Sequence, residues 1–197
     1  AANMGSSTLL ITPRLQNIAQ MSCNPAMGGI AKGQIIKEID ALGGYSGIVT
    51  DYSAIQFKML NKSKGPAVWS PRAQSDRMMF SLKWRELLEK TPNLDFYQDS
   101  VVGLLVKKNI VCGVVTQLGL QIESKTVVLT NGTFLNGLIH IGNKKISAGR
   151  VNEQASKALG EFLISLKLPM SRLKTGTPPR IFKKSVNFSI LEKDDAD

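Results

Sequence analysis

The chain has 197 residues, 43% of them hydrophobic, and a formal net charge of +10. This length and composition fit a folded protein with its own core, and no apolar run approaches the ~20 residues that a membrane-spanning helix needs. The first residues lack the pattern of a secretory signal, and two cysteines are too few for a disulfide framework. We therefore expect a cytoplasmic protein.

The N-terminal residues predict a helix end followed by a strand. Residues 1–5 read as the last turn of a helix with Gly5 as its left-handed cap, which suggests a piece of a longer protein. Residues 7–11 form a short β-prone apolar run that Thr12-Pro13 ends. We expect a buried strand there.

A glycine-rich segment with a thiol follows at residues 23–33. It holds Cys23, Gly28, Gly29, Lys32 and Gly33. Glycines allow a ligand to approach the backbone, and the helix predicted over residues 30–42 would direct its N–H groups toward the loop. This arrangement suits an anionic or electron-rich planar ligand beside a thiol. An ordinary glycine-rich turn that precedes a helix is the alternative.

Two further helices are predicted before residue 92. Asp51 would cap a helix that runs through Ile55, Phe57 and Met59. The strongest helical pattern covers residues 72–90 and ends at Thr91-Pro92. Its apolar residues are expected to pack in the core; they are Met78, Met79, Leu82, Leu87 and Leu88.

Short β-like runs then follow one another. They cover residues 94–98, 101–106, 110–116, 120–123 and 126–129. The loops at 107–109 and 117–119 are short enough for hairpins, so residues 99–125 are predicted to form an antiparallel meander inserted in a βαβ pattern. Cys112 is expected to be a small core residue of this meander.

The run from Val127 to Leu129 breaks into Thr130, Asn131 and Gly132. Nucleotides bind at the carboxyl ends of buried parallel strands, so these three residues are candidates for a cofactor site. A plain tight turn is the alternative. A helix is predicted over residues 152–166.

Positive charge is concentrated in residues 144–184, where ten Lys or Arg residues face only two acids, Glu153 and Glu161. Such a segment favours a polyanion such as nucleic acid, although a solvated basic face is the alternative. The candidates for phosphate contacts are Arg150, Arg172, Lys174 and Arg180. His140 is the only histidine and is expected to be structural, and no spacing suggests a metal site.

Five segments together resemble one family. They are residues 20–33, 37–44, 63–67 with 72–74, 128–135 and 172–180. In this order they resemble the GidA (MnmG) family, the flavoprotein subunit that modifies the wobble uridine of tRNA. The resemblance implies an α/β fold in which residues 1–197 are part of a glutathione-reductase-like FAD-binding dinucleotide fold. The first strand and the Gly-rich phosphate loop of that fold would precede Ala1.

The resemblance also implies an activity. The family uses FAD, NADH and methylene-tetrahydrofolate, and with a GTPase partner subunit it installs a carboxymethylaminomethyl or aminomethyl group at C5 of the wobble uridine. A homodimer within a heterotetramer is implied as well. Val101, Ser156 and the turn Thr130–Gly132 would contact FAD, and Gly28 and Gly29 would lie against its ring.

Cys23 matches a cysteine that the family uses in its chemistry, and a thiol beside a helix N-terminus is a better nucleophile. The family's second cysteine would follow Asp197, and the present piece is expected to be inactive alone. Two alternative functions stay open. One is a folate- and FAD-dependent tRNA uridine-5-methyltransferase, and the other is a basic RNA-binding module without chemistry.

Overall fold

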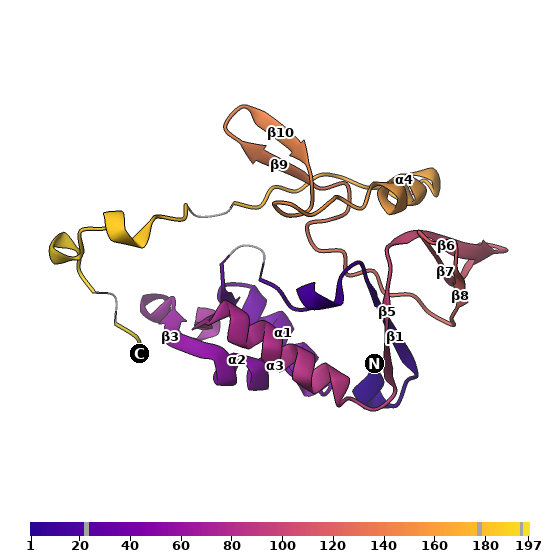
Figure 1. The fold of residues 1–197 in the computed structure, drawn as a ribbon. Helices are drawn as coiled ribbons and strands as arrows, with labels where there is room; N and C mark the ends of the chain where they lie inside the picture. The colour runs from indigo at the N-terminus through magenta and orange to yellow at the C-terminus, as the bar shows by residue number, and fades with distance from the viewer. Residues whose placement is uncertain (22–23, 177–178, 194) are drawn as a thin grey trace. The chain divides into compact units, whose positions relative to one another are not determined.

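A computed structural model of the chain describes residues 1–21, 24–176, 179–193 and 195–197 (Figure 1). It is mixed α/β, and the predicted fold class is confirmed. The chain divides into two compact units. Unit 1 holds Ala1–Thr8, Gln16–Asp95 and Lys174–Asp197, and unit 2 holds Leu9–Leu15 and Phe96–Leu173. Among the described residues no helix combines the length and apolarity that a membrane span requires.

The helices of unit 1 come early in the chain. They are the 3₁₀ turn η1 (Ala2–Met4), α1 (Lys32–Ala41), α2 (Ser46–Ser53) and α3 (Arg77–Glu89). Gly5 has φ +87° and closes η1 as a left-handed cap, as predicted. The predicted helix before Gly43 is confirmed as α1. Beyond η1, the described residues form five further 3₁₀ turns, two of them near the C-terminus: η2 (Leu15–Asn17), η3 (Lys62–Lys64), η4 (Pro66–Val68), η5 (Lys183–Ser185) and η6 (Phe188–Ile190).

Unit 1 also contains an antiparallel sheet in the order β2–β4–β3. Its strands are β2 (Ala26–Gly28), β3 (Ala54–Leu60) and β4 (Ser70–Ser75). The predicted helix through Ile55, Phe57 and Met59 is therefore wrong. These residues recur with the period of two that belongs to a strand, and Asp51 lies inside α2 rather than at a cap.

Helix α3 begins at Arg77, five residues later than predicted, because β4 takes residues 70–75 into the sheet. The Asp76 carboxylate caps α3 by accepting hydrogen bonds from the N–H groups of Met78 and Met79, at 2.9 and 2.8 Å. Phe80 is buried. Met78, Met79 and Leu82 are exposed, which contradicts the prediction that they pack in the core.

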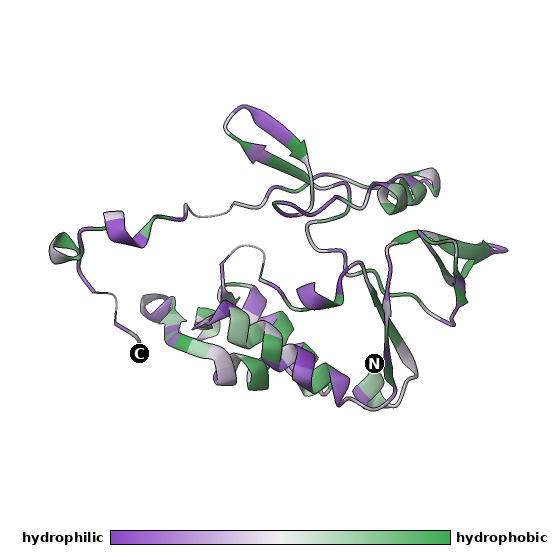
Figure 2. Ribbon diagram, in the orientation of Figure 1, coloured by the Kyte–Doolittle hydropathy of each residue, from purple (hydrophilic) through white to green (hydrophobic). Residues whose placement is uncertain are grey.

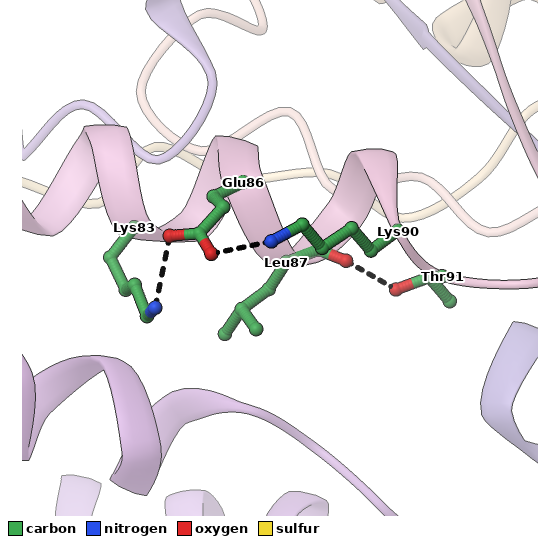
Figure 3. A network of polar contacts seen from close by, with 5 residues as sticks. All are labelled: Lys83, Glu86, Leu87, Lys90 and Thr91. Carbon is green, nitrogen blue, oxygen red and sulfur yellow. Dashed lines mark hydrogen bonds and ion pairs between the residues drawn. The ribbon is translucent and has the colours of Figure 1, made fainter.

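The solvent side of α3 carries a polar network (Figure 3). The Glu86 carboxylate pairs with Lys83 at 2.9 Å and Lys90 at 2.8 Å, at helical spacings of three and four residues. The Thr91 hydroxyl donates to the Leu87 carbonyl at 2.8 Å, which closes the helix at the predicted Thr91-Pro92 end.

Strands β1 (Thr8–Thr12) and β5 (Leu94–Gln98) pair with each other. The N–H of Thr8 donates to Asn93, and the N–H of Asp99 donates to Thr12, so the two strands run parallel. The run at residues 7–11 is thus a strand. It is half-buried rather than buried, with Leu9 39% exposed.

Unit 2 contains the antiparallel sheet β6–β7–β8, formed by β6 (Val101–Lys107), β7 (Ile110–Thr116) and β8 (Gln121–Glu123). The three hairpin-connected strands predicted there are confirmed. Lys108 and Asn109 form a two-residue turn with φ values of +50° and +63°. The Cys112 thiol is half-buried and lies 3.4 Å from the Leu105 carbonyl.

The rest of unit 2 is the hairpin β9 (Leu138–Ile141) with β10 (Lys144–Ser147), and α4 (Lys157–Ser165). Figure 2 shows hydrophilic and hydrophobic residues mixed along this hairpin, whereas β6 and β7 are largely hydrophobic. The predicted strand at residues 126–129 is wrong, because the segment is irregular and Val128 is 82% exposed. An apolar run needs a pairing neighbour to become a strand, and this one has none among the described residues.

Candidate cofactor and nucleic-acid site

The turn after β2 is formed by Gly28 and Gly29, with φ values of +81° and +91°. The Gly29 N–H donates to the Pro71 carbonyl at 2.9 Å. A Cβ atom on Gly28 would lie 2.3 Å from that carbonyl oxygen, so the contact with β4 by itself requires glycine there. Approach of these two glycines to a flavin ring stays a prediction. Cys23 lies outside the described residues.

Val101 and Ser156 lie on two elements of unit 2 that pack against each other. Val101 begins β6 and pairs with Thr116, and Ser156 is the residue that precedes α4. Helix α4 packs on β6 so closely that a Cβ atom on Gly103 would lie 3.3 Å from the Phe162 ring. The structure thus brings the two residues that the family resemblance selected to one helix–strand pair.

The Ser156 backbone holds the loop that precedes β9. Its N–H donates to the Phe134 carbonyl at 2.8 Å, and its carbonyl accepts from the Asn136 N–H at 3.1 Å. Within the described part of the chain the Ser156 hydroxyl neither caps α4 nor makes another hydrogen bond. A serine at a helix start normally caps, so this hydroxyl is available to a ligand.

Thr130, Asn131 and Gly132 precede this loop in an irregular segment rather than at a strand end. Gly132 has φ +56°, and the Phe134 N–H donates to the Asn131 carbonyl at 3.1 Å, which forms a tight turn. These residues lie in unit 2, whereas Gly28 and Gly29 lie in unit 1. A single pocket that contains both glycine turns remains a prediction.

Asp99 is a residue of this region that the sequence interpretation did not select. It is 9% exposed and accepts hydrogen bonds from the N–H groups of Ser100 and Leu118, at 2.7 and 3.1 Å. The Thr116 hydroxyl first, and then these two N–H groups, hold the pKa of the Asp99 carboxyl below its usual value. Asp99 thereby fixes Ser100, which precedes Val101, and Thr116, which pairs with Val101 in the sheet. An Asp-Ser pair just before a strand was the available signal.

The four predicted phosphate-binding cations lie in different surroundings. Arg150 is already engaged: its Nε lies 3.0 Å from Glu153, its guanidinium lies 5.5 Å from the Phe134 ring centroid, and its side chain is 17% exposed. Arg172, Lys174 and Arg180 are exposed. Arg172 belongs to unit 2, and the other two belong to unit 1.

Arg172 lines a cavity of about 310 Å³ in unit 2. Its guanidinium donates to the Asn136 carbonyl at 3.0 Å. The cavity also contains Lys157 and Glu161, so two cations face one acid. Arg172 therefore contacts the same loop residue, Asn136, that is hydrogen-bonded to the Ser156 carbonyl. Arg150 instead forms an ion pair with Glu153.

Metal-binding side chains do not gather in the described part of the chain. No group of three or more His, Cys, Asp or Glu residues there could hold a metal ion. His140 is exposed on β9.

These features define a region of an α/β protein that presents a helix–strand pair with an available hydroxyl, and the same unit carries the exposed cations Lys157 and Arg172. The family model described as "Glucose inhibited division protein A" matches residues 1–197, and the chain belongs to this GidA family. Two relatives named "tRNA uridine 5-carboxymethylaminomethyl modification enzyme MnmG" are 62% identical (Flavobacterium johnsoniae) and 64% identical (Christiangramia forsetii) over the whole chain.

The chain spans 32% of the length of each of these relatives. Among solved structures, GidA from Aquifex aeolicus is 48% identical over the whole chain, with a TM-score of 0.91, and the match covers 32% of that protein. The GidA-related protein from Thermus thermophilus is 23% identical, with a TM-score of 0.56 over 84% of this chain and 60% of its own, and it shows similarity of fold alone. The family resemblance predicted from the sequence is confirmed.

Proposed function

We propose that the chain is part of an FAD-dependent enzyme that modifies C5 of the wobble uridine in tRNA. The observation that carries this proposal is the match of all 197 residues to the GidA family, with relatives at 62–64% identity named as tRNA uridine modification enzymes. The product is a carboxymethylaminomethyl or aminomethyl uridine. NADH, methylene-tetrahydrofolate, a GTPase partner subunit and homodimer formation belong to the same proposal.

The residues of unit 2 fit the nucleotide end of FAD. Ser156 has a hydroxyl without a hydrogen-bond partner in the described part of the chain, beside the N-terminus of α4. Val101 supplies strand backbone on β6, the strand that α4 covers. When bound, FAD supplies hydride transfer between the nicotinamide and the one-carbon unit. The role of Ser156 and Val101 is to hold the nucleotide, and the proposed role of Cys23 is nucleophilic attack on the pyrimidine.

Cations at the surface would hold the RNA. Arg172, Lys174 and Arg180 are exposed and able to neutralise phosphate charge. The sequence also predicts Arg150 as a phosphate contact, but its guanidinium already pairs with Glu153. We therefore propose that the three exposed residues provide most of the electrostatic contact with tRNA.

The FAD assignment is tested with Ser156→Ala in the intact protein. Loss of one hydrogen bond should weaken FAD binding about 2- to 10-fold, measured by titration of flavin fluorescence. The melting temperature should not change, because the hydroxyl does not cap α4. Ser165→Ala is the matched control, since that hydroxyl donates to the Phe162 carbonyl of its own helix. Equal FAD affinity in both variants would remove Ser156 from the site.

The tRNA assignment is tested by gel shift with the triple variant Arg172→Ala, Lys174→Ala, Arg180→Ala. The affinity should fall and its salt dependence should become weaker, by a slope of about one per lost phosphate contact. Arg150→Ala is expected to change the affinity less than any of the three. Wild-type affinity in the triple variant would contradict the proposed RNA contact.

A further inference from the structure

One face of the β2–β4–β3 sheet is polar. The register places Lys58 opposite Arg72 and Gln56 opposite Gln74. Residues directly opposite one another in an antiparallel pair share a face of the sheet. All four of these side chains are half-buried, whereas Ile55 on the other face of β3 is 71% exposed. The sheet therefore covers charged and amide groups that are normally left in water.

Two cations lie side by side on this polar face. Like charges directly opposite each other in a sheet are destabilising, so Lys58 and Arg72 oppose the pairing of β3 with β4. The acid placed near this edge is Asp197, which accepts hydrogen bonds from Lys62 and from the Met59 N–H, at 2.5 Å each. Lys62 first, with a smaller contribution from Lys58, lowers the pKa of Asp197. Arg72 forms no ion pair with an acid of the described residues.

Arg72 lies against the glycine turn. It is paired with Gly28 in the sheet, and its Cδ atom is 3.8 Å from the position that a Cβ atom on Gly29 would take. Its Nε atom is buried and has no hydrogen-bond partner within the described part of the chain. A buried guanidinium donor without a partner is destabilising, and such groups in proteins are normally satisfied.

We propose that Arg72, with Lys58 beside it, anchors a phosphate or carboxylate group of a small-molecule substrate that lies against the Gly28–Gly29 turn. The guanidinium fork matches either anion with two parallel hydrogen bonds. An anion bound there also interacts favourably with the positive charge of both side chains. The proposal rests on the proposed function, whose two small substrates carry these groups: NADH carries phosphates, and methylene-tetrahydrofolate carries glutamate carboxylates.

A small molecule fits this position better than RNA. Arg72 is half-buried on a sheet face, whereas the cations proposed for tRNA are exposed on irregular segments. Phosphate groups of a large RNA reach exposed side chains most easily. The glycine turn beside Arg72 presents no side chain that would block a small ligand.

The test uses Arg72→Gln and Arg72→Lys in the intact protein, with Lys37→Gln as the matched control. Lys37 is exposed on α1, and its loss removes the same unit of charge from unit 1. Binding of NADH, tetrahydrofolate and tRNA is measured by calorimetry. We expect Arg72→Gln to weaken one of the two small ligands at least 10-fold, Arg72→Lys to weaken it less, and Lys37→Gln to leave it within twofold.

The ligand that Arg72→Gln binds more weakly shows which anionic group Arg72 contacts. That group is a phosphate if the ligand is NADH and a carboxylate if it is tetrahydrofolate. Unchanged affinity for both ligands in Arg72→Gln would overturn the inference. So would a loss confined to tRNA, or an equal loss for all three ligands together with a lower melting temperature. Binding of FAD and tRNA by the unsubstituted protein tests the proposed function separately. If that binding holds while Arg72→Gln has no effect, only the inference about Arg72 fails.

Discussion

At the scale of single residues, glycines with similar backbone angles serve different purposes in this chain. Gly28 and Gly5 both lie in unit 1, with φ values of +81° and +87°. A Cβ atom on Gly28 would lie 2.3 Å from the Pro71 carbonyl oxygen, whereas one on Gly5 would meet nothing within 4 Å. Gly28 is therefore required by packing as well as by its angle, and Gly5 by its angle alone.

This difference predicts the relative cost of two alanine substitutions. Gly5→Ala should cost about 1 kcal/mol, because alanine adopts the left-handed region unfavourably. Gly28→Ala should cost clearly more, about 3 kcal/mol, because β2 must also move away from β4. Urea unfolding of the two variants measures the difference. Equal destabilisation would mean that the contact with Pro71 relaxes without cost.

At the scale of elements, α3 shows how charges on a helix surface shift a titration. Hydrogen bonds from Lys90 and Lys83, followed by their positive charges, lower the pKa of Glu86 to about 2. The pKa in the unfolded chain is near 4.5. The contribution of ionised Glu86 to stability is thus present above pH 4.5 and is lost as the pH falls through 2. Since Glu86 is exposed, this contribution is small.

Titration of Glu86 by NMR should give an apparent pKa of about 2 at low salt. Lys90→Ala should raise this pKa toward 4.5, since it removes the largest cause of the shift. Added salt should raise it in the same direction by screening the lysine charges. Lys37→Ala, on α1, is the control that should leave it unchanged. A wild-type pKa near 4.5 would show that the ion pairs do not persist in solution.

The β6–β7 hairpin offers a stabilising change. Lys108 and Asn109 both adopt positive φ, which is the conformation of a type I′ turn. Asn-Gly is the preferred pair there, so the double variant Lys108→Asn, Asn109→Gly should increase the free energy of unfolding by about 1 kcal/mol. Denaturant unfolding of unit 2 checks this. A decrease would indicate that the Lys108 side chain contributes contacts that outweigh the backbone preference.

At the scale of the whole molecule, local sequence patterns predicted several helices and strands correctly, but they predicted strand pairing and side-chain burial poorly. The hairpins of β6–β8 and the helix α1 follow from short-range periodicity and turn residues. The predictions of a strand at residues 126–129 and of burial for Met78 and Leu82 were wrong. Strand pairing and burial depend on partners that are distant in sequence, and the periodicity of a segment carries no information about those partners.

The candidate site follows the same rule. Composition predicted a basic segment, and the family resemblance selected Val101 and Ser156. Neither could predict that Glu153 neutralises Arg150, or that Arg72 lies with a buried unpaired nitrogen on a sheet face. These features arise from the pairing of strands and from turns that bring acids to cations, and they become visible only in three dimensions.

The basic segment yields a prediction for the intact protein with and without tRNA. Limited trypsin digestion should cut first after Arg172, Lys174 and Arg180, which are exposed on irregular backbone, and much later after Arg150, whose side chain is 17% exposed and ion-paired. Bound tRNA should slow the cuts after Arg172, Lys174 and Arg180 several-fold, and high salt should abolish this protection because the contacts are electrostatic. Cleavage after Lys108, at the tip of the β6–β7 hairpin, provides the internal reference. Equal rates with and without tRNA at all three exposed sites, under conditions where a gel shift shows complex formation, would place the RNA on another surface.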